Sequence, residues 1–120
     1  MENSDLIKKI CKAALDKKAE KVTVINLDGM TVIADAFVIC SAGSKTHVRA
    51  VCDNIEDEMK KQGISALRED GYDEARWVVL DYGDVIVHVF YEEDRQFYDL
   101  ERLWSNGNNM REILEEQQFG

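Results

Sequence analysis

The stretch Arg76-Trp-Val-Val-Leu-Asp-Tyr-Gly-Asp-Val-Ile-Val-His-Val-Phe90 decides the fold of this chain. Two apolar runs flank its central Asp-Tyr-Gly-Asp, which predicts a β-hairpin in which Gly83 supplies a positive φ. The stretch that follows, residues 91–104, has apolar side chains at helical spacing: Phe97, Leu100, Leu103 and Trp104. This spacing predicts helical turns that pack one face onto the hairpin.

Side chains along the hairpin alternate between two faces of different chemistry. With a two-residue loop, Tyr82-Gly83, Asp81 would pair with Asp84 and Trp77 with His88. One face is aliphatic throughout, with Val78, Leu80, Val85, Val87 and Val89. The other face is mixed, with Trp77, Val79, Ile86, His88 and Phe90. A strand pair that is apolar on both faces is either covered on both faces by the rest of the protein or exposes one face to a partner. We therefore expect the aliphatic face to lie in the core and the mixed face to contain the functional site.

Acidic residues are concentrated around the same stretch. Residues 69–101 contain eleven acidic and two basic residues, so their net charge of −9 equals the formal net charge of the whole chain. Such a run can serve solvation alone. Here it surrounds aromatic side chains, and an acidic rim around aromatic anchors suits a basic protein partner. Phosphates would be repelled, so we expect no direct, specific binding to nucleic acid.

The polar residues of the hairpin allow more than one interpretation. Asp81 and Asp84 can act as a general acid and base or as ordinary turn residues, and we favour a third role, in which they present negative charge beside Tyr82 to a basic partner. His88 has no Ser or Cys nucleophile within the motif, which favours a buried, hydrogen-bonded histidine over a catalytic one. Trp77 shares the mixed face with His88 and is our candidate anchor for the partner.

Two ordered motifs in this region resemble those of a known family. Residues 77–90 read Trp-x-x-Leu-Asp-Tyr-Gly-Asp-Val-Ile-Val-His-Val-Phe, and residues 95–104 read Arg-x-Phe-Tyr-x-Leu-Glu-x-Leu-Trp. Both are similar to the ribosomal silencing factor family, also called Iojap-like proteins. Upstream, residues 35–41 resemble that family's Asp-Tyr-Phe-Val-Ile strand, with Ala36 where Tyr is usual. Together the matches cover roughly residues 5–105.

The resemblance implies a concrete function. Such factors bind a protein of the large ribosomal subunit, L-fourteen, near the face that meets the small subunit. They block subunit joining sterically and silence translation when nutrients are short. The family also implies a homodimer off the ribosome. The residues that match suggest a contact surface formed by Trp77, Asp81, Tyr82 and Asp84, with Tyr98 and Glu101 as further candidates.

Length and composition predict one domain with a substantial core, since the chain has 120 residues of which 45% are hydrophobic. It contains no run of about 20 apolar residues that predicts a membrane span, and its start lacks the regions of a signal peptide. We therefore expect a cytoplasmic protein without membrane contact. Cys11, Cys40 and Cys52 are scattered and predict buried, reduced thiols. Since the cysteines are scattered and the chain has only two histidines, His47 and His88, we expect no metal site. We also expect no cofactor.

The remaining patterns predict helices over residues 4–19 and 44–62 and strands over residues 21–26, 35–41 and 64–68. Ser4 and Ser44 are the candidate N-caps, and Gly63 ends the second helix. We therefore expect a single α/β domain over residues 1–105, with a mixed sheet of about five strands flanked by helices. If the strands on either side of the second helix are parallel, that helix forms a right-handed crossover. Residues 106–120 predict a polar linker followed by a short C-terminal helix, a disordered tail or a segment packed on a second subunit.

The strand–loop–helix unit at Gly43-Ser44 raises a rival function. Nucleotidyltransferases place Gly-Ser before a helix and two carboxylates on the next strand, where these hold metal ions that bridge nucleotide phosphates. Residues 64–68 contain no such pair. We therefore expect a nucleotidyltransferase-like topology without the metal site, and no enzymatic activity. A general adaptor for basic proteins is the other alternative.

Overall fold

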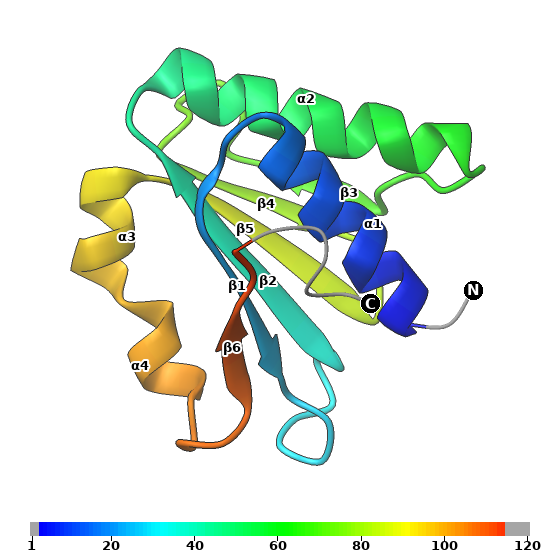
Figure 1. The fold of residues 1–120 in the computed structure, drawn as a ribbon, viewed down its shortest axis with the longest axis vertical. Helices are drawn as coiled ribbons and strands as arrows, with labels where there is room; N and C mark the ends of the chain where they lie inside the picture. The colour runs from blue at the N-terminus through cyan, green and yellow to red at the C-terminus, as the bar shows by residue number, and fades with distance from the viewer. Residues whose placement is uncertain (1–2, 115–120) are drawn as a thin grey trace.

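A six-stranded mixed sheet with helices against both of its faces forms residues 3–114, the part of the chain that the computed structural model describes (Figure 1). The elements in chain order are α1 (Asn3–Asp16), β1 (Glu20–Asn26), β2 (Ala36–Ala42), α2 (Lys45–Lys61), β3 (Arg68–Asp70), β4 (Trp77–Asp81), β5 (Val85–Tyr91), α3 (Glu92–Tyr98), α4 (Leu100–Trp104) and β6 (Met110–Glu112). The strands lie in the order β3-β4-β5-β2-β1-β6. The predicted α/β domain with a mixed sheet is confirmed, with one strand more than expected.

Strands β2 and β5 form the centre of the sheet and run parallel, with Val38 opposite Val87. All the other neighbouring strands are antiparallel. Two antiparallel steps separate β5 from β3, so β3 points in the same direction as β2. Helix α2 therefore connects two strands of the same direction, which is the crossover arrangement that the sequence predicted.

The hairpin of β4 and β5 closes in a register that differs from the predicted one. Asp81 lies opposite Ile86 rather than opposite Asp84, and the two-residue loop consists of Gly83 and Asp84. The predicted pairing is therefore wrong by two residues. Because side chains alternate with a period of two, a shift of two leaves every residue on its predicted face. Gly83 has the positive φ that the turn required, 86°.

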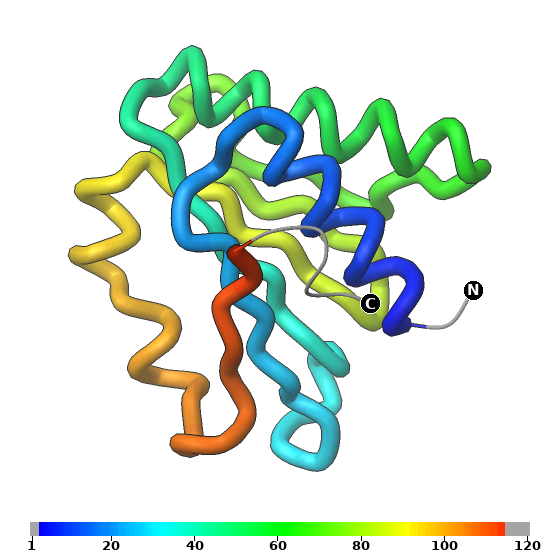
Figure 2. Tube along the Cα trace, in the orientation of Figure 1, coloured from blue at the N-terminus to red at the C-terminus, as the bar shows by residue number. Residues whose placement is uncertain are grey.

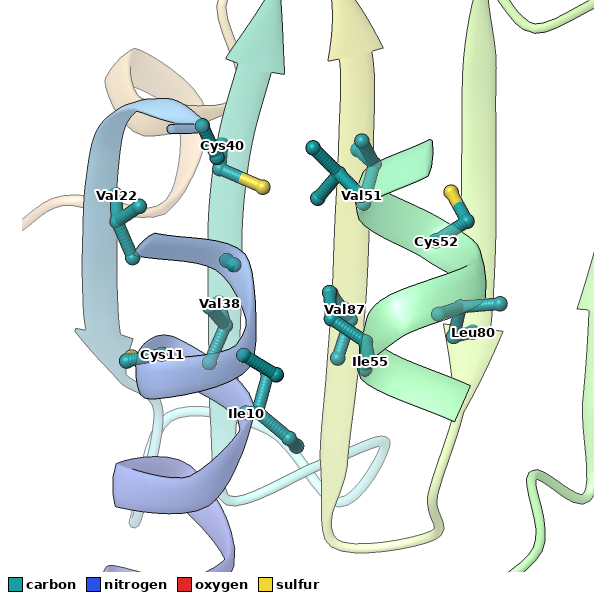
Figure 3. Packing of buried hydrophobic residues seen from close by; sticks show 14 of the residues in the cluster. Ile10, Cys11, Val22, Val38, Cys40, Val51, Cys52, Ile55, Leu80 and Val87 are labelled. Carbon is teal, nitrogen blue, oxygen red and sulfur yellow. The ribbon is translucent and has the colours of Figure 1, made fainter. Parts of the chain in front are cut away.

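Helices α1 and α2 cover one face of the sheet. Figure 3 shows Ile10 of α1 and Ile55 of α2 among strand residues such as Val38 and Val87. The aliphatic residues of the hairpin are all fully buried beneath this layer: Val78, Leu80, Val85, Val87 and Val89. This face is the main core, as the sequence predicted.

The three cysteines belong to the same layer. Cys11, Cys40 and Cys52 are buried and free of disulfide bonds, as predicted. Burial raises the pKa of Cys11 and of Cys40 to about 12, so both are uncharged thiols near neutral pH. They act as small apolar side chains in the core.

The caps of the helices agree with the sequence for α2 and disagree for α1. Ser44 Oγ accepts a hydrogen bond from the His47 amide at 3.1 Å, and Gly63 follows the helix with a φ of 77°. Helix α1 already includes Asn3, so Ser4 lies inside the helix and its prediction as the N-cap is wrong. None of the helices within residues 3–114 is long and apolar enough to cross a membrane.

The helical turns after the hairpin are broken in the middle. Asp99 adopts a left-handed conformation, with φ 48° and ψ 55°, and separates α3 from α4. Leu100 and Trp104 pack on the second face of the sheet, whereas Phe97 and Leu103 are 79% and 72% exposed. The prediction that all four share one packed face is therefore wrong: the break at Asp99 ends the helical spacing between Phe97 and Leu100, and Leu103 lies on the exposed side of α4.

Both edges of the sheet are short strands of three exposed residues, β3 and β6. Strand β3 is at an edge as predicted, but it covers residues 68–70 instead of 64–68. Figure 2 shows β6 alongside β1, with which it pairs antiparallel. The prediction of a helix or disordered tail is thus wrong for residues 110–112, and its remaining part, residues 115–120, lies outside the described residues.

Candidate partner-binding surface

A groove of about 610 Å³ lies where the loop after β3, the start of β4 and helix α3 meet. Its lining residues are Gly71, Glu74, Arg76, Trp77, Glu93, Asp94, Phe97 and Tyr98. We call it the aromatic groove, since Trp77, Phe97 and Tyr98 form its apolar walls. It opens on the mixed side of the hairpin, the side on which the sequence predicted the functional site.

Two contacts hold the loop of the groove in place. Gly71 has a φ of 86°, and a Cβ at this position would collide with the carbonyl oxygen of Trp77, so the close approach requires glycine. Arg76 donates from Nε and Nη2 to the two carboxylate oxygens of Asp94, at 3.0 and 3.1 Å. This bidentate pair joins the loop to α3 and neutralises the basic side chain of the groove.

Trp77 is the centre of an aromatic cluster that runs from the core to the solvent. Its ring stacks on that of Phe90, with the ring centroids 5.0 Å apart, and is tilted against the ring of Tyr98, with the centroids 4.7 Å apart. Phe97 meets Tyr98 edge to face at 5.1 Å. Phe90 is fully buried, Trp77 is half-buried, and Tyr98 and Phe97 are exposed. The exposed end offers apolar area that nothing in the described chain covers.

His88 lies at the buried end of this cluster. Its Nδ1 accepts a hydrogen bond from Trp77 Nε1 at 3.0 Å, and Phe37 packs edge-on against its ring at 4.6 Å. Burial lowers the pKa of His88 to about 4, so the imidazole is neutral at pH 7. The predicted buried, hydrogen-bonded histidine is confirmed. Its Nε2 is buried and has no hydrogen-bond partner among the described residues.

The rim of the aromatic groove is acidic. Three carboxylates, from Glu74, Glu93 and Asp94, face one guanidinium, from Arg76. Asp94 is largely buried in its pair with Arg76, whereas Glu74 and Glu93 are exposed. The groove therefore combines exposed aromatic rings with an excess of negative charge, a combination that suits a basic partner.

The structure separates the contact residues that the sequence predicted. Trp77 and Tyr98 meet in the groove. Asp81 lies at the other end of β4, four residues or about 13 Å along the strand from Trp77, and Asp84 lies in the loop that follows. Asp81 Oδ1 accepts from the Gly83 amide at 2.8 Å, which is a turn contact, and Asp84 is exposed. Tyr82 is only 9% exposed and belongs to the main core.

Glu101 is half of a clamp that fastens α3 and α4 to the sheet. Arg95 is 5% exposed and donates from Nε to Glu101 Oε2 at 3.0 Å. Its other nitrogens donate to oxygens of β1 and β2, namely Glu20 O, Lys21 O, Thr23 Oγ1 and Ser41 Oγ. The exposed aromatic residues of α3 thus stand on a rigid support.

The carboxylates of α2, which the rival interpretation singles out, do not form a metal site with their neighbours. Within residues 3–114, no three His, Cys, Asp or Glu side chains gather where they could hold a metal ion. Glu56 lies beside Glu69 of the edge strand β3 instead. Burial, together with a hydrogen bond to Glu69 and repulsion from it, raises the pKa of Glu56 to about 7.

Of the eight residues that line the groove, the sequence predicted only Trp77 and Tyr98 as contact residues. Phe97 was assigned to the packed face, but the left-handed Asp99 interrupts the helical spacing on which that assignment depended, and Phe97 is exposed. Glu74 and Glu93 were counted in the acidic run, but their positions in the chain do not show that the loop and α3 converge. The concentration of acids around aromatic residues was the available signal.

Comparisons with known proteins agree with the resemblance. The family model described as "Ribosomal silencing factor during starvation" matches residues 1–119. The ribosomal silencing factor RsfS of Halalkalibacterium halodurans is 42% identical over 106 residues, which are 88% of this chain and 91% of that protein. RsfS of Bacillus subtilis is 39% identical over 106 residues, which are 88% and 90% of the two chains.

Solved structures share the fold. A crystal structure from Bacillus halodurans superposes with a TM-score of 0.81 at 39% identity, over 92% of this chain and 100% of that one. The match therefore includes both the helix-covered face and the hairpin that carries the groove. On the sequence match and the shared fold together, the chain belongs to the ribosomal silencing factor family.

Proposed function

We propose that this protein binds the large ribosomal subunit through the aromatic groove and blocks joining of the small subunit. Relatives with 39% and 42% identity are named ribosomal silencing factors. The contact on the subunit is ribosomal protein L-fourteen, at the face that meets the small subunit. A protein seated there occludes the joining face in the cytoplasm and represses translation when nutrients are short. Occlusion requires no catalytic residue and no cofactor.

The observation that carries this proposal is the exposed aromatic cluster within an acidic rim. Tyr98 and Phe97 are 45% and 79% exposed beside half-buried Trp77, and Trp and Tyr are the residues most enriched at the centres of protein interfaces. The exposed carboxylates of Glu74 and Glu93 complement a basic ribosomal protein. The same charge disfavours ribosomal RNA as the direct contact.

The contact residues have different roles in this proposal. Trp77 and Tyr98 form the centre of the contact. Asp81, at the end of β4, and Asp84, in the hairpin loop, form a second acidic contact. Tyr82 and Glu101 expose little surface and support the contact from below.

Off the ribosome, we propose that a second copy covers the same apolar surface. An exposed cluster of this kind is costly to leave in water, and two copies can shield each other. The molar mass from light scattering tests this, since Trp77→Ala should shift the equilibrium from dimer to monomer. A dimer of unchanged stability in that variant would place the interface elsewhere.

The decisive experiment is sedimentation of purified ribosomal subunits at associating Mg²⁺ concentrations, with and without the protein. We expect the joined-ribosome peak to fall and the protein to migrate with the large subunit. Trp77→Ala and Glu93→Lys should both weaken this effect. Asp57→Lys is the matched control, because it reverses an exposed carboxylate on α2, in the layer on the other side of the sheet.

The possible outcomes separate the classes of function. Migration with neither subunit and an unchanged joined peak would contradict ribosome silencing. Binding to many basic proteins without preference for the large subunit would indicate a general adaptor. Equal loss of binding in Glu93→Lys and Asp57→Lys would show that overall charge, and not the groove, determines the contact.

A further inference from the structure

The Trp77 indole is fixed by a residue that lies beneath it. His88 is 6% exposed and sits on β5, opposite Val79, while Trp77 on β4 lies opposite Phe90. Trp77 and His88 are therefore diagonal neighbours, a distance that long aromatic side chains bridge. The indole Nε1–H reaches His88 Nδ1 at 3.0 Å.

The chemistry of this hydrogen bond allows only one direction. An indole N–H donates and never accepts, so His88 Nδ1 is the acceptor and the ring is neutral, with its hydrogen on Nε2. Burial of the imidazole keeps it in this form near pH 7. The indole is then held by the hydrogen bond to His88, by the ring of Phe90 stacked on it and by a tilted contact with Tyr98.

We propose that His88 is a positioning residue for partner binding, whose Nδ1 holds the Trp77 indole in the orientation that lines the aromatic groove. This rests on the proposed function, in which Trp77 is the anchor. A side chain that is already ordered loses less freedom when the partner docks, and this saving corresponds to about twofold to tenfold in affinity. His88 acts on the partner only through Trp77.

Two substitutions separate positioning from packing. His88→Leu keeps a buried apolar side chain but removes the acceptor, whereas His88→Asn places its amide oxygen near the position of Nδ1. The first readout is the indole N–H signal of the free protein in ¹⁵N-edited NMR. The chain has two tryptophans, and Trp104→Phe assigns the signals. We expect the Trp77 signal to shift and its exchange with water to accelerate in His88→Leu and to stay close to wild type in His88→Asn.

The second readout is the dissociation constant for isolated large ribosomal subunits. His88→Leu should raise it about twofold to tenfold, and His88→Asn should restore most of the affinity. In a Trp77→Ala background, His88→Leu should have no further effect, because the two residues act as one unit. Thermal melting confirms that each variant is folded before binding is measured.

Three results would overturn the inference. An unchanged indole signal in His88→Leu would show that Nδ1 does not set the orientation of Trp77. An equal loss of affinity with and without Trp77 would assign His88 a merely structural role. If Trp77→Ala leaves binding unchanged, Trp77 is not the anchor, and the role of His88 in binding fails together with the proposed site. The indole signal of His88→Leu still shows separately whether His88 fixes the orientation of Trp77.

Discussion

The two faces of the sheet differ in how completely helices cover them. Helices α1 and α2, with 14 and 17 residues, bury the aliphatic side of the hairpin entirely. Helices α3 and α4, with 7 and 5 residues, cover only part of the mixed side. The first face has the continuous core that a domain of this size needs for stability. The second face leaves apolar area exposed, at Phe97, Tyr98 and Leu103.

Under the proposed function, one side of these strands provides stability and the other side provides recognition of the partner. On β4, Leu80 is fully buried beneath α2, while Trp77 is half-buried in the groove. Substitutions on the two sides should therefore affect different properties, the stability of the fold or the affinity for the partner. Those on the covered side should lower stability, and those at the exposed end of the mixed side should lower binding.

The largest loss of stability is expected from breaking the clamp between the sheet and the short helices. Arg95→Ala removes the hydrogen bonds that Arg95 donates to the Glu101 carboxylate and to four oxygens of β1 and β2, and should cost about 3–5 kcal/mol. Urea denaturation measures this. The double variant Arg95→Met with Glu101→Leu should recover part of the loss, because it removes the unpaired Glu101 carboxylate but not the four strand oxygens. A loss below about 1 kcal/mol for Arg95→Ala would show that α3 and α4 do not depend on the clamp.

Equal truncations on the two faces sharpen the comparison directly. Leu80→Ala on the covered face should cost about 2–5 kcal/mol, because it leaves a cavity in a fully buried site. Ile86→Ala on the mixed face should cost clearly less, since Ile86 is already partly exposed. Chemical denaturation of both variants gives the difference. Similar losses would mean that the mixed face is as well packed as the covered one.

The buried histidine makes stability depend on pH. The pKa of His88 is about 4 in the folded chain and about 6.5 when unfolded, so the unfolded chain binds the proton more tightly. Stability should therefore fall as the pH drops from 6.5 to 4, by up to about 3 kcal/mol from this group. Measuring the unfolding free energies of the wild type and of His88→Leu across this pH range isolates the contribution of His88. Parallel curves for the two proteins would argue against a buried neutral imidazole.

Glu56 should produce a smaller effect of opposite sign. Its pKa is about 7 in the folded chain and 4.5 unfolded, so the folded chain holds the proton more tightly and stability falls as the pH rises from 4.5 to 7. Glu56→Gln should raise stability at pH 8 by about 1 kcal/mol or less, since the group is largely exposed to screening by solvent. Denaturation at pH 5 and pH 8 tests this, and no gain at pH 8 would contradict it.

The smallest effect on stability is expected at the exposed end of the groove. Phe97→Ser should change the unfolding free energy by no more than about 0.5 kcal/mol, because Phe97 is 79% exposed. The same variant should weaken binding to large subunits, since it removes apolar area that the partner would bury. A fall in melting temperature without loss of binding would reverse the assignment of the two faces.

Much of the fold could be predicted, because it depends on patterns with a fixed period. The hairpin faces were correct even though the register was wrong, since an error of two residues preserves alternation. The limits of α2 followed from Ser44 and Gly63, whose chemistry marks the ends of helices. Such signals are local and independent of the rest of the chain.

The site was harder to predict, because it depends on where distant segments meet. Asp99 breaks the helical turns in a left-handed conformation; Asp is one of the few residues besides glycine that adopt it, but Asp is also common elsewhere, so its type alone did not predict the break or the exposure of Phe97. Tyr82 follows an acidic residue in a turn and nevertheless points into the core. Residues 110–112 form a strand because β1 offers a free edge, which a helical pattern cannot reveal.

The edge strands also determine how such a protein stays dispersed. An open sheet beside an uncovered aromatic surface is at risk of growing into fibrils, because a free strand edge recruits further strands. Here each edge offers only three residues, Arg-Glu-Asp in β3 and Met-Arg-Glu in β6, so incoming strands meet charges and gain few hydrogen bonds. Association is thereby directed to the face of the molecule and away from its edges. Short, charged edges of this kind lower the risk that an exposed aromatic surface leads to edge-to-edge aggregation.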